Sequence, residues 1–189
     1  MGDARGVKPS SAKVRNPGSD KNNDMADTTS KRHSRFILVA GMIVVLDQLI
    51  KAAVLATIPA YHTVTVLPGF FNLTHIYNTG GAFGFLSGNP SSMQQIFFLT
   101  ASIVAAGLIL FLYGKTPPGQ AALELGFSLI LGGAAGNVID RIRIGKVVDF
   151  LDFHIMGMHW PAFNVADSAI TVGMLIFIYH LLFNKLPQS

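Results

Sequence analysis

The sequence predicts a mainly α-helical membrane protein with four transmembrane helices and a small strand-forming segment on the outer side of the membrane. Half of the 189 residues are hydrophobic, only 13% are charged, and the mean hydropathy is +0.46. Soluble domains carry about 25% charged residues, so lipid is the natural solvent for this chain. Four apolar segments approach the length needed to cross the bilayer, and they set the number of helices.

Residues 1–35 are predicted to be a disordered, basic, cytoplasmic tail. They are rich in Ser, Asn, Asp, Gly and Lys and almost lack large apolar side chains, so burial cannot offset their ordering entropy. Eight of the fourteen Lys and Arg residues lie before Phe36. We therefore interpret the net charge of +4 as a signal for membrane orientation, and we expect no nucleic-acid partner.

The first membrane span is predicted at Phe36–Ala56. A basic region before an apolar one also fits a secretory signal peptide over residues 1–60, but this apolar run is too long and no convincing small-residue cleavage site ends it. The other spans are predicted at Ile96–Tyr113, Ala121–Ile139 and approximately Ala162–Phe183. The membrane domain then covers residues 36–184, and residues 185–189 form a cytoplasmic C-terminal tail.

Four spans place both termini on the same side of the membrane. The basic tail, Lys115 and Lys185 fall together on that side, which the positive-inside rule identifies as cytoplasmic. Arg141, Arg143 and Lys146 would lie outside, against the rule, which suggests that function holds them there.

The outer segment of residues 59–90 is not helical in pattern at its start. His62–Leu67 alternates and is rich in β-branched residues, and Phe70–Tyr77 is similar, with a Pro-Gly pair between them. This pattern predicts a small hairpin or two short strands. Asn78–Leu86 is Gly- and Phe-rich and amphiphilic, which fits a short segment lying at the level of the lipid headgroups.

The first and third spans carry polar residues at helical spacing. Asp47 and Lys51 are four residues apart, which predicts an ion pair on one helical face, either a local neutralisation or part of a site. In the third span Gly133, Asn137 and Arg141 repeat every four residues, and Asp140 lies beside them. Gly132 and Gly136 form a small-xxx-small pair that lets a neighbouring helix approach closely.

The fourth span opens with a polar stripe. Asn164, Asp167, Ser168 and Thr171 fall at i, i+3, i+4 and i+7. Asn164 also fits an N-cap and Asp167 a first-turn carboxylate favoured by the helix dipole, which would be a purely structural role. Asp149, in the short polar connection before this span, is by itself an ordinary loop carboxylate.

Convergence favours a functional site over these separate interpretations. Four spans bring six polar residues to the same outer membrane level: Asp47, Asn137, Asp140, Asp149, Asn164 and Asp167. Ionisable groups at membrane depth are expensive and mark functional sites by default. We therefore predict that Asp149 and Asp167 form a carboxylate pair doing acid–base chemistry. Glu124 and His180 lie near the inner face, at helix ends where their side chains can reach water.

Other chemistries find less support in the sequence. No H-E-x-x-H, G-x-S-x-G, Walker A or dinucleotide motif occurs, and there is no cysteine. His154 and His159, five apart in a predicted loop, are a weak metal signal, so we expect neither a metal nor a cofactor. A small transporter or channel subunit would place polar residues throughout the membrane depth, and a structural subunit would tolerate Asp→Asn changes.

Five motifs carry a family resemblance: LDQLIK (Leu46–Lys51), YNTGGAF (Tyr77–Phe83), GGAAGNVIDR (Gly132–Arg141), VVDF (Val147–Phe150) and FNVADS (Phe163–Ser168). In order and spacing they resemble the motif set of bacterial lipoprotein signal peptidase (signal peptidase II), over about residues 36–184. The long polar N-terminal tail departs from the short start usual in that family. Gly81 stands where Ala is commoner.

The resemblance implies four transmembrane helices with a small periplasmic β-cradle and a short amphipathic periplasmic segment. It implies a bacterial inner-membrane protein with both termini cytoplasmic and an active site near the periplasmic face. The implied activity is that of an aspartyl endopeptidase without a cofactor. It would remove signal peptides from diacylglyceryl-modified prolipoproteins, cutting before the lipidated cysteine, in contact with membrane lipids and open to the antibiotic globomycin.

The resemblance also implies roles for particular residues. The catalytic aspartates fall on Asp149 and Asp167. Four residues match positions that line the site or contact the substrate or globomycin: Asn78, Asn137, Arg141 and Asn164. Four more belong to the supporting set: Asp47, Lys51, Asp140 and Gly133.

Overall fold

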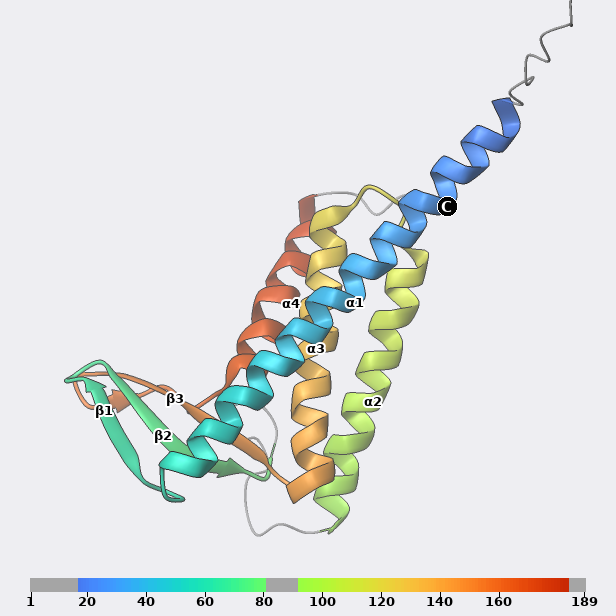
Figure 1. The fold of residues 1–189 in the computed structure, drawn as a ribbon. Helices are drawn as coiled ribbons and strands as arrows, with labels where there is room; N and C mark the ends of the chain where they lie inside the picture. The colour runs from blue at the N-terminus through green and yellow to red at the C-terminus, as the bar shows by residue number, and fades with distance from the viewer. Residues whose placement is uncertain (1–16, 81–91, 184–189) are drawn as a thin grey trace, which may run out of the picture.

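The computed structural model describes residues 17–80 and 92–183, which form four helices and four strands. In chain order these are α1 (Pro17–Thr57), β1 (Thr63–Leu67), β2 (Phe71–Asn78), α2 (Ser92–Lys115), α3 (Ala121–Ile144), β3 (Val147–Ile155), β4 (Met158–His159) and α4 (Val165–Phe183). The helices lie side by side, and the strands extend from one end of the bundle (Figure 1). The α2–α3 connection lies at the opposite end.

Each of the described helices is long and apolar enough to cross a membrane, over Thr28–Thr57, Met93–Lys115, Ala121–Ile144 and Val165–Phe183. This confirms the predicted mainly helical fold with four membrane spans. Helix α3 is central, because it packs against α1, α2 and α4. Apolar side chains on the outer faces stay exposed, among them Ile37, Leu108 and Leu182, as a lipid-facing surface requires.

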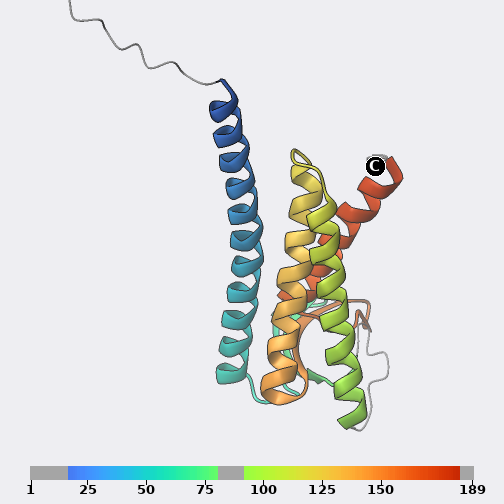
Figure 2. The same ribbon diagram turned by 90° about the vertical axis from the view of Figure 1, so that its right-hand side faces the viewer.

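Helix α1 is longer than the sequence predicted. It begins at Pro17, a residue type favoured at the first helical position, so residues 17–35 are helical. This corrects the expectation of a disordered tail for that stretch, while residues 1–16 lie outside the described part of the chain. A helix already formed by a membrane span extends without a new nucleation cost, and Figure 2 shows α1 running well past the other helices.

The end of the bundle away from the sheet is held by a buried ion pair. Glu124 is 7% exposed, with Arg32 Nε at 3.0 Å and Arg35 Nη2 at 3.8 Å from its carboxylate. Arg32 also donates to the backbone carbonyl of Tyr113 at 2.9 Å, and its guanidinium lies 4.6 Å from the centre of the Tyr113 ring. The prediction that Glu124 reaches water is therefore wrong, since the arginines of α1 come to it instead.

The strands form one sheet in the order β1-β2-β3-β4, and every neighbouring pair is antiparallel. Strands β1 and β2 lie within one residue of the predicted limits at each end, which confirms the predicted hairpin. Between β2 and β3, Phe71 pairs with Phe153 and Ile76 pairs with Asp149, with a bulge in between. The extra residue of this bulge lies on β2.

Strand β3 replaces what the sequence predicted as a short polar connection. Its first four residues, Val147–Phe150, are all buried, so no alternation of polar and apolar residues marked it as a strand. Val148 and Phe150 pack with Val54 of α1 and with Ile58, the residue after α1, which anchors the sheet to the helix bundle. Asp149 therefore projects from a strand that pairs with β2 and packs against the helix bundle, rather than from a loop.

The predicted amphipathic segment, Asn78–Leu86, lies outside the described residues from residue 81 onward. Its first residue, Asn78, ends β2. The described C-terminal end of α4 lies at the same end of the bundle as the extension of α1 (Figures 1 and 2).

Candidate active site

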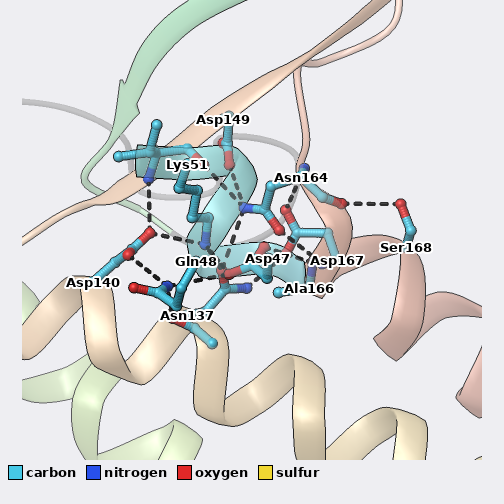
Figure 3. A network of polar contacts seen from close by, with 12 residues as sticks. Asp47, Gln48, Lys51, Asn137, Asp140, Asp149, Asn164, Ala166, Asp167 and Ser168 are labelled. Atoms are coloured by element: carbon cyan, nitrogen blue, oxygen red, sulfur yellow. Dashed lines mark hydrogen bonds and ion pairs between the residues drawn. The ribbon is translucent and has the colours of Figure 1, made fainter. Parts of the chain in front are cut away.

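The predicted polar residues meet at the end of the bundle that carries the sheet. Asp149 comes from β3, Asp167 from the first turn of α4, and Asn137 from α3. Asn164, directly before α4, contacts all three of them, and Figure 3 shows this network. Segments far apart in the sequence therefore supply one continuous polar cluster inside an apolar fold.

The carboxylate of Asp149 is only 2% exposed and accepts two side-chain hydrogen bonds. Asn164 donates to Oδ1 at 2.7 Å, and Asn78 donates to Oδ2 at 3.0 Å. Burial, together with the nearby charge of Asp167, raises the pKa of Asp149 to about 7, against the opposing effect of the two hydrogen bonds. Asp149 therefore holds a proton at pH values where an ordinary aspartate has lost it.

Asp167 combines a helix-capping role with membership of the site. The backbone N–H of Asp167 donates to Asn164 Oδ1 at 2.9 Å, and the backbone N–H of Asn164 donates back to Asp167 Oδ2 at 3.3 Å. This reciprocal pair is a capping box at the start of α4, as the structural interpretation of the sequence expected. Asn137 donates to the other oxygen, Oδ1, at 2.8 Å. Unlike Asp149, the Asp167 side chain is only partly buried.

A buried ion cluster lies beneath the two aspartates. Lys51 Nζ is 2.8 Å from Asp47 and 2.8 Å from Asp140, and it donates to Asn137 Oδ1 at 3.1 Å. This confirms the predicted ion pair between Asp47 and Lys51 and adds a third partner from α3. Because Lys51 takes the amide oxygen of Asn137, the amide nitrogen is left facing Asp167.

The same cluster fixes the backbone on both sides of the site. Asp47 Oδ1 accepts from the backbone N–H of Ala166, one residue before Asp167, at 3.0 Å. Asp140 Oδ2 accepts from the N–H of Val148, one residue before Asp149, at 3.2 Å. Each supporting carboxylate thus holds the chain next to one of the paired aspartates.

Gln48 belongs to this cluster, and the sequence reasoning missed it. Its amide nitrogen donates to Asp47 at 3.2 Å, to the Gly136 carbonyl at 3.1 Å and to Asp140 at 3.0 Å. Its oxygen accepts from Arg143 at 3.2 Å. The available signal was an amide residue inside an apolar span, directly after Asp47.

Glycines of α3 allow the close approach that the cluster requires. A Cβ atom at Gly133 would overlap the backbone carbonyl of Ala166, and one at Gly136 would lie 2.8 Å from the Asp47 carboxylate. At Gly132 it would lie 2.7 Å from the carbonyl of Ala40 on α1. The packing role predicted for these glycines is therefore confirmed, and Gly133 brings α3 against the turn that carries Asp167.

Arg141 lies at the edge of the site. Its Nη2 donates to the carbonyl of Gly80 at 3.2 Å, and its guanidinium lies 5.6 Å from the centre of the Phe98 ring. Asn78 lies two residues before Gly80 and accepts from the Gly80 N–H at 2.9 Å. Arg141 and Asn78 thereby fix the first described residues of the chain that leaves β2.

Every residue predicted for the site and its support lies within this region, and the catalytic and substrate-contacting roles expected for these residues stay predictions. Among the described residues, one group could hold a metal ion: Asp152, His154 and His159 of β3 and β4. It does not include Asp149 or Asp167. Fold and site together define a polytopic membrane protein with two converging aspartates at one end of its helix bundle. Such a pair is able to perform acid–base chemistry.

Comparison with known proteins gives the family. The sequence profile of signal peptidase (SPase) II matches residues 39–183. The chain is 51% identical over 154 residues to a lipoprotein signal peptidase of Desulforapulum autotrophicum, a match covering 82% of this chain and 95% of that protein. It is 43% identical over 154 residues to that of Syntrophus aciditrophicus, covering 82% and 96%.

The fold has solved counterparts as well. A bacterial membrane enzyme determined at 2.3 Å superposes with a TM-score of 0.72 at 34% identity, covering 82% of this chain and 94% of the other. A second such structure, at 1.9 Å, gives a TM-score of 0.70 at 34% identity, covering 80% and 95%. This protein belongs to the signal peptidase II family, and the family resemblance predicted from the five motifs is confirmed.

Proposed function

We propose that this protein is an aspartyl endopeptidase that removes signal peptides from diacylglyceryl-modified prolipoproteins, cutting before the lipidated cysteine. Family membership supports the peptidase class, and the relatives named above are lipoprotein signal peptidases. The observation that carries the mechanism is the convergence of Asp149 and Asp167 on Asn164, in a site built from α3, β3 and α4.

The two carboxylates would share the acid and base roles. Asp149, with a pKa of about 7, would carry the proton, and Asp167 would be ionised. The partial exposure of Asp167, its place at the start of α4 and the hydrogen bond from Asn137 all favour its charged form. Because the groups interact, they titrate as a pair.

The chemistry would then proceed through one water molecule. Asp167 takes a proton from this water as its oxygen attacks the scissile carbonyl, forming a C–O bond, while the proton of Asp149 hydrogen-bonds to the carbonyl oxygen. In the second step the C–N bond breaks, and the proton acquired by Asp167 passes to the leaving amine. The products are a carboxylic acid on the signal peptide and a free amino group on the lipidated cysteine.

Substrate positioning would fall to the residues at the edge of the site. Arg141 and Asn78 hold the chain around Gly80, next to Asp149, where a peptide would have to enter. We propose that the substrate's lipid chains stay in the bilayer, so that membrane depth contributes to specificity. In this proposal the sheet faces the periplasm, both termini are cytoplasmic, and globomycin competes for the same site.

The test is cleavage by the purified full-length protein. A lipidated precursor and the same precursor without lipid are incubated with the wild type, Asp149→Asn and Asp167→Asn, each with and without globomycin. We expect cleavage of the lipidated precursor only, inhibition by globomycin, and a loss of roughly 10³-fold or more in either variant.

The matched control is Glu124→Gln, which neutralises a buried carboxylate at the opposite end of the bundle and should retain cleavage. Activity in a folded Asp149→Asn or Asp167→Asn variant would remove that residue from the chemistry. Equal cleavage of the unlipidated precursor would refute the proposed substrate class while leaving the carboxylate mechanism intact.

A further inference from the structure

The hairpin of β3 and β4 carries a second group of chemically active side chains. Asp152 and His154 lie on β3 and His159 on β4, and each offers a ligand atom within 4.8 Å of the others. From the sequence, the two histidines are a weak metal signal in a predicted loop. In the structure they face each other in a hydrogen-bonded ladder.

The hairpin fixes the register that brings these groups together. Asp152 and His154 are two residues apart on one strand and therefore share a face of the sheet. His154 pairs directly with His159 across the ladder, and their rings stack with centres 4.6 Å apart and planes at 12°. The two-residue turn consists of Met156 and Gly157, with positive φ angles of 50° and 79°, as tight hairpin turns favour.

Hydrogen bonds show that most of the potential metal-ligand atoms are unprotonated, which is the form that binds a cation. A carboxylate only accepts, so the Asn72 amide nitrogen faces Asp152, at 2.8 Å from Oδ2. The same nitrogen lies 3.2 Å from His154 Nδ1, and because an amide nitrogen only donates, that ring atom carries a lone pair. His159 Nδ1 lies 2.8 Å from Asp152 Oδ1 and shares a proton with it.

The Asp152 carboxylate is buried and accepts a hydrogen bond on each oxygen, from Asn72 and from His159. An acceptor group thus lies next to two imidazoles, and a cation can take the place of the proton between Asp152 and His159.

We propose that Asp152, His154 and His159 bind one divalent transition-metal ion, of which Zn²⁺ fits best. Two imidazoles and a carboxylate are ligands that Zn²⁺ accepts, whereas Ca²⁺ and Mg²⁺ require oxygen ligands. Three protein ligands leave a fourth position for water. The two histidines line a surface pocket together with Phe70 and Trp160, so solvent and ions reach them.

The ion would act as a structural link within the sheet. It joins β3 to β4, and Asn72 of β2 supports two of the three ligands. Asp149 and Asp152 both lie on β3 but share no hydrogen-bond partner: Asn78 and Asn164 donate to Asp149, whereas Asn72 and His159 contact Asp152. The metal site is therefore separate from the carboxylate pair, and we expect the ion to raise thermal stability without being required for cleavage.

The experiment is titration of the full-length protein with Zn²⁺ by calorimetry, after removal of any polyhistidine tag. We expect one ion per chain, no binding of Ca²⁺ or Mg²⁺, and release of protons that depends on pH. His154→Ala, His159→Ala and Asp152→Asn should each weaken binding at least about tenfold. The control is His62→Ala, which removes an exposed imidazole before β1 and should bind as the wild type does.

Unchanged affinity in the double variant His154→Ala/His159→Ala would overturn the proposal, as would the absence of a stoichiometric site in the wild type. If a variant fails to fold, the wild type itself gives the answer. X-ray absorption of the Zn²⁺-loaded protein should show two imidazole nitrogens and one carboxylate, and any other ligand set would refute the assignment.

Discussion

The side-chain amide of Asn164 donates a hydrogen bond of 2.7 Å to the carboxylate of Asp149. This bond favours the charged form of Asp149 and so opposes burial and the charge of Asp167, which together raise the pKa to about 7. The net effect is a carboxyl group that titrates near neutral pH. Its protonation state should therefore be visible in the pH dependence of the reaction.

The first prediction concerns that pH dependence. In the proposed mechanism Asp149 must be protonated, so kcat/KM should fall as the pH rises through about 7. Removing a donor to the charged form raises the pKa, so in Asn164→Ala the falling limb should move to higher pH. Asn78→Ala removes the other donor without touching the cap of α4 and should shift the limb in the same direction. The measurement is kcat/KM between pH 5 and 9, and a shift to lower pH in both variants contradicts the assignment.

The second prediction separates the effect of Asp149 on the stability of the protein from its role in cleavage. A carboxyl whose pKa rises from 3.8 to about 7 on folding binds more protons in the folded state, so its contribution to stability falls as the pH rises between these values. Asp149→Asn should therefore be inactive, yet it should gain stability relative to wild type between pH 5 and 8, by up to about 4 kcal/mol. The measurement is Tm of both proteins at several pH values. A Tm difference that does not change with pH would show that Asp149 does not titrate in this range.

The third prediction concerns the ion cluster below the site. Lys51 is 1% exposed and forms ion pairs with both Asp47 and Asp140. Lys51→Met leaves two buried carboxylates without a cation, which should destabilise the protein by roughly 3–5 kcal/mol. Lys115→Met, at an exposed helix end, serves as the control and should change stability by less than about 0.5 kcal/mol. The measurements are folded yield and Tm in detergent. Equal yield and Tm of the two variants would show that the cluster does not stabilise the fold.

Much of this site could be predicted because residues three or four positions apart share a helix face whatever packs around the helix. The pairing of Asp47 with Lys51 and the convergence at one bundle end follow from four apolar spans of known direction. Residue patterns could not reveal β3, because its start is buried on both faces and Asp is uncommon in strands. Only the packing of Val148 and Phe150 against α1 makes that segment a strand.

The burial of Glu124 has a different cause. It depends on Arg32 meeting Glu124 across the bundle, a contact between residues 92 positions apart that neither local composition nor periodicity encodes. The aspects that escaped prediction are thus those decided by tertiary contacts. Gln48 escaped for the same reason, since its partners lie mainly on α3.

The fourth prediction tests the close approach of α3 and α4. A Cβ at Gly133 would overlap the carbonyl of Ala166, which directly precedes Asp167, so Gly133→Ala should displace the start of α4. We expect a loss of stability of about 1–3 kcal/mol and a fall in kcat/KM, because Asp167 moves away from its partner. Gly107→Ala on α2 meets nothing within 4 Å and should stabilise the protein by about 0.5–1 kcal/mol with unchanged activity. Tm and kcat/KM of the two variants decide the matter: if Gly133→Ala behaves as Gly107→Ala does, contact between these helices does not position Asp167.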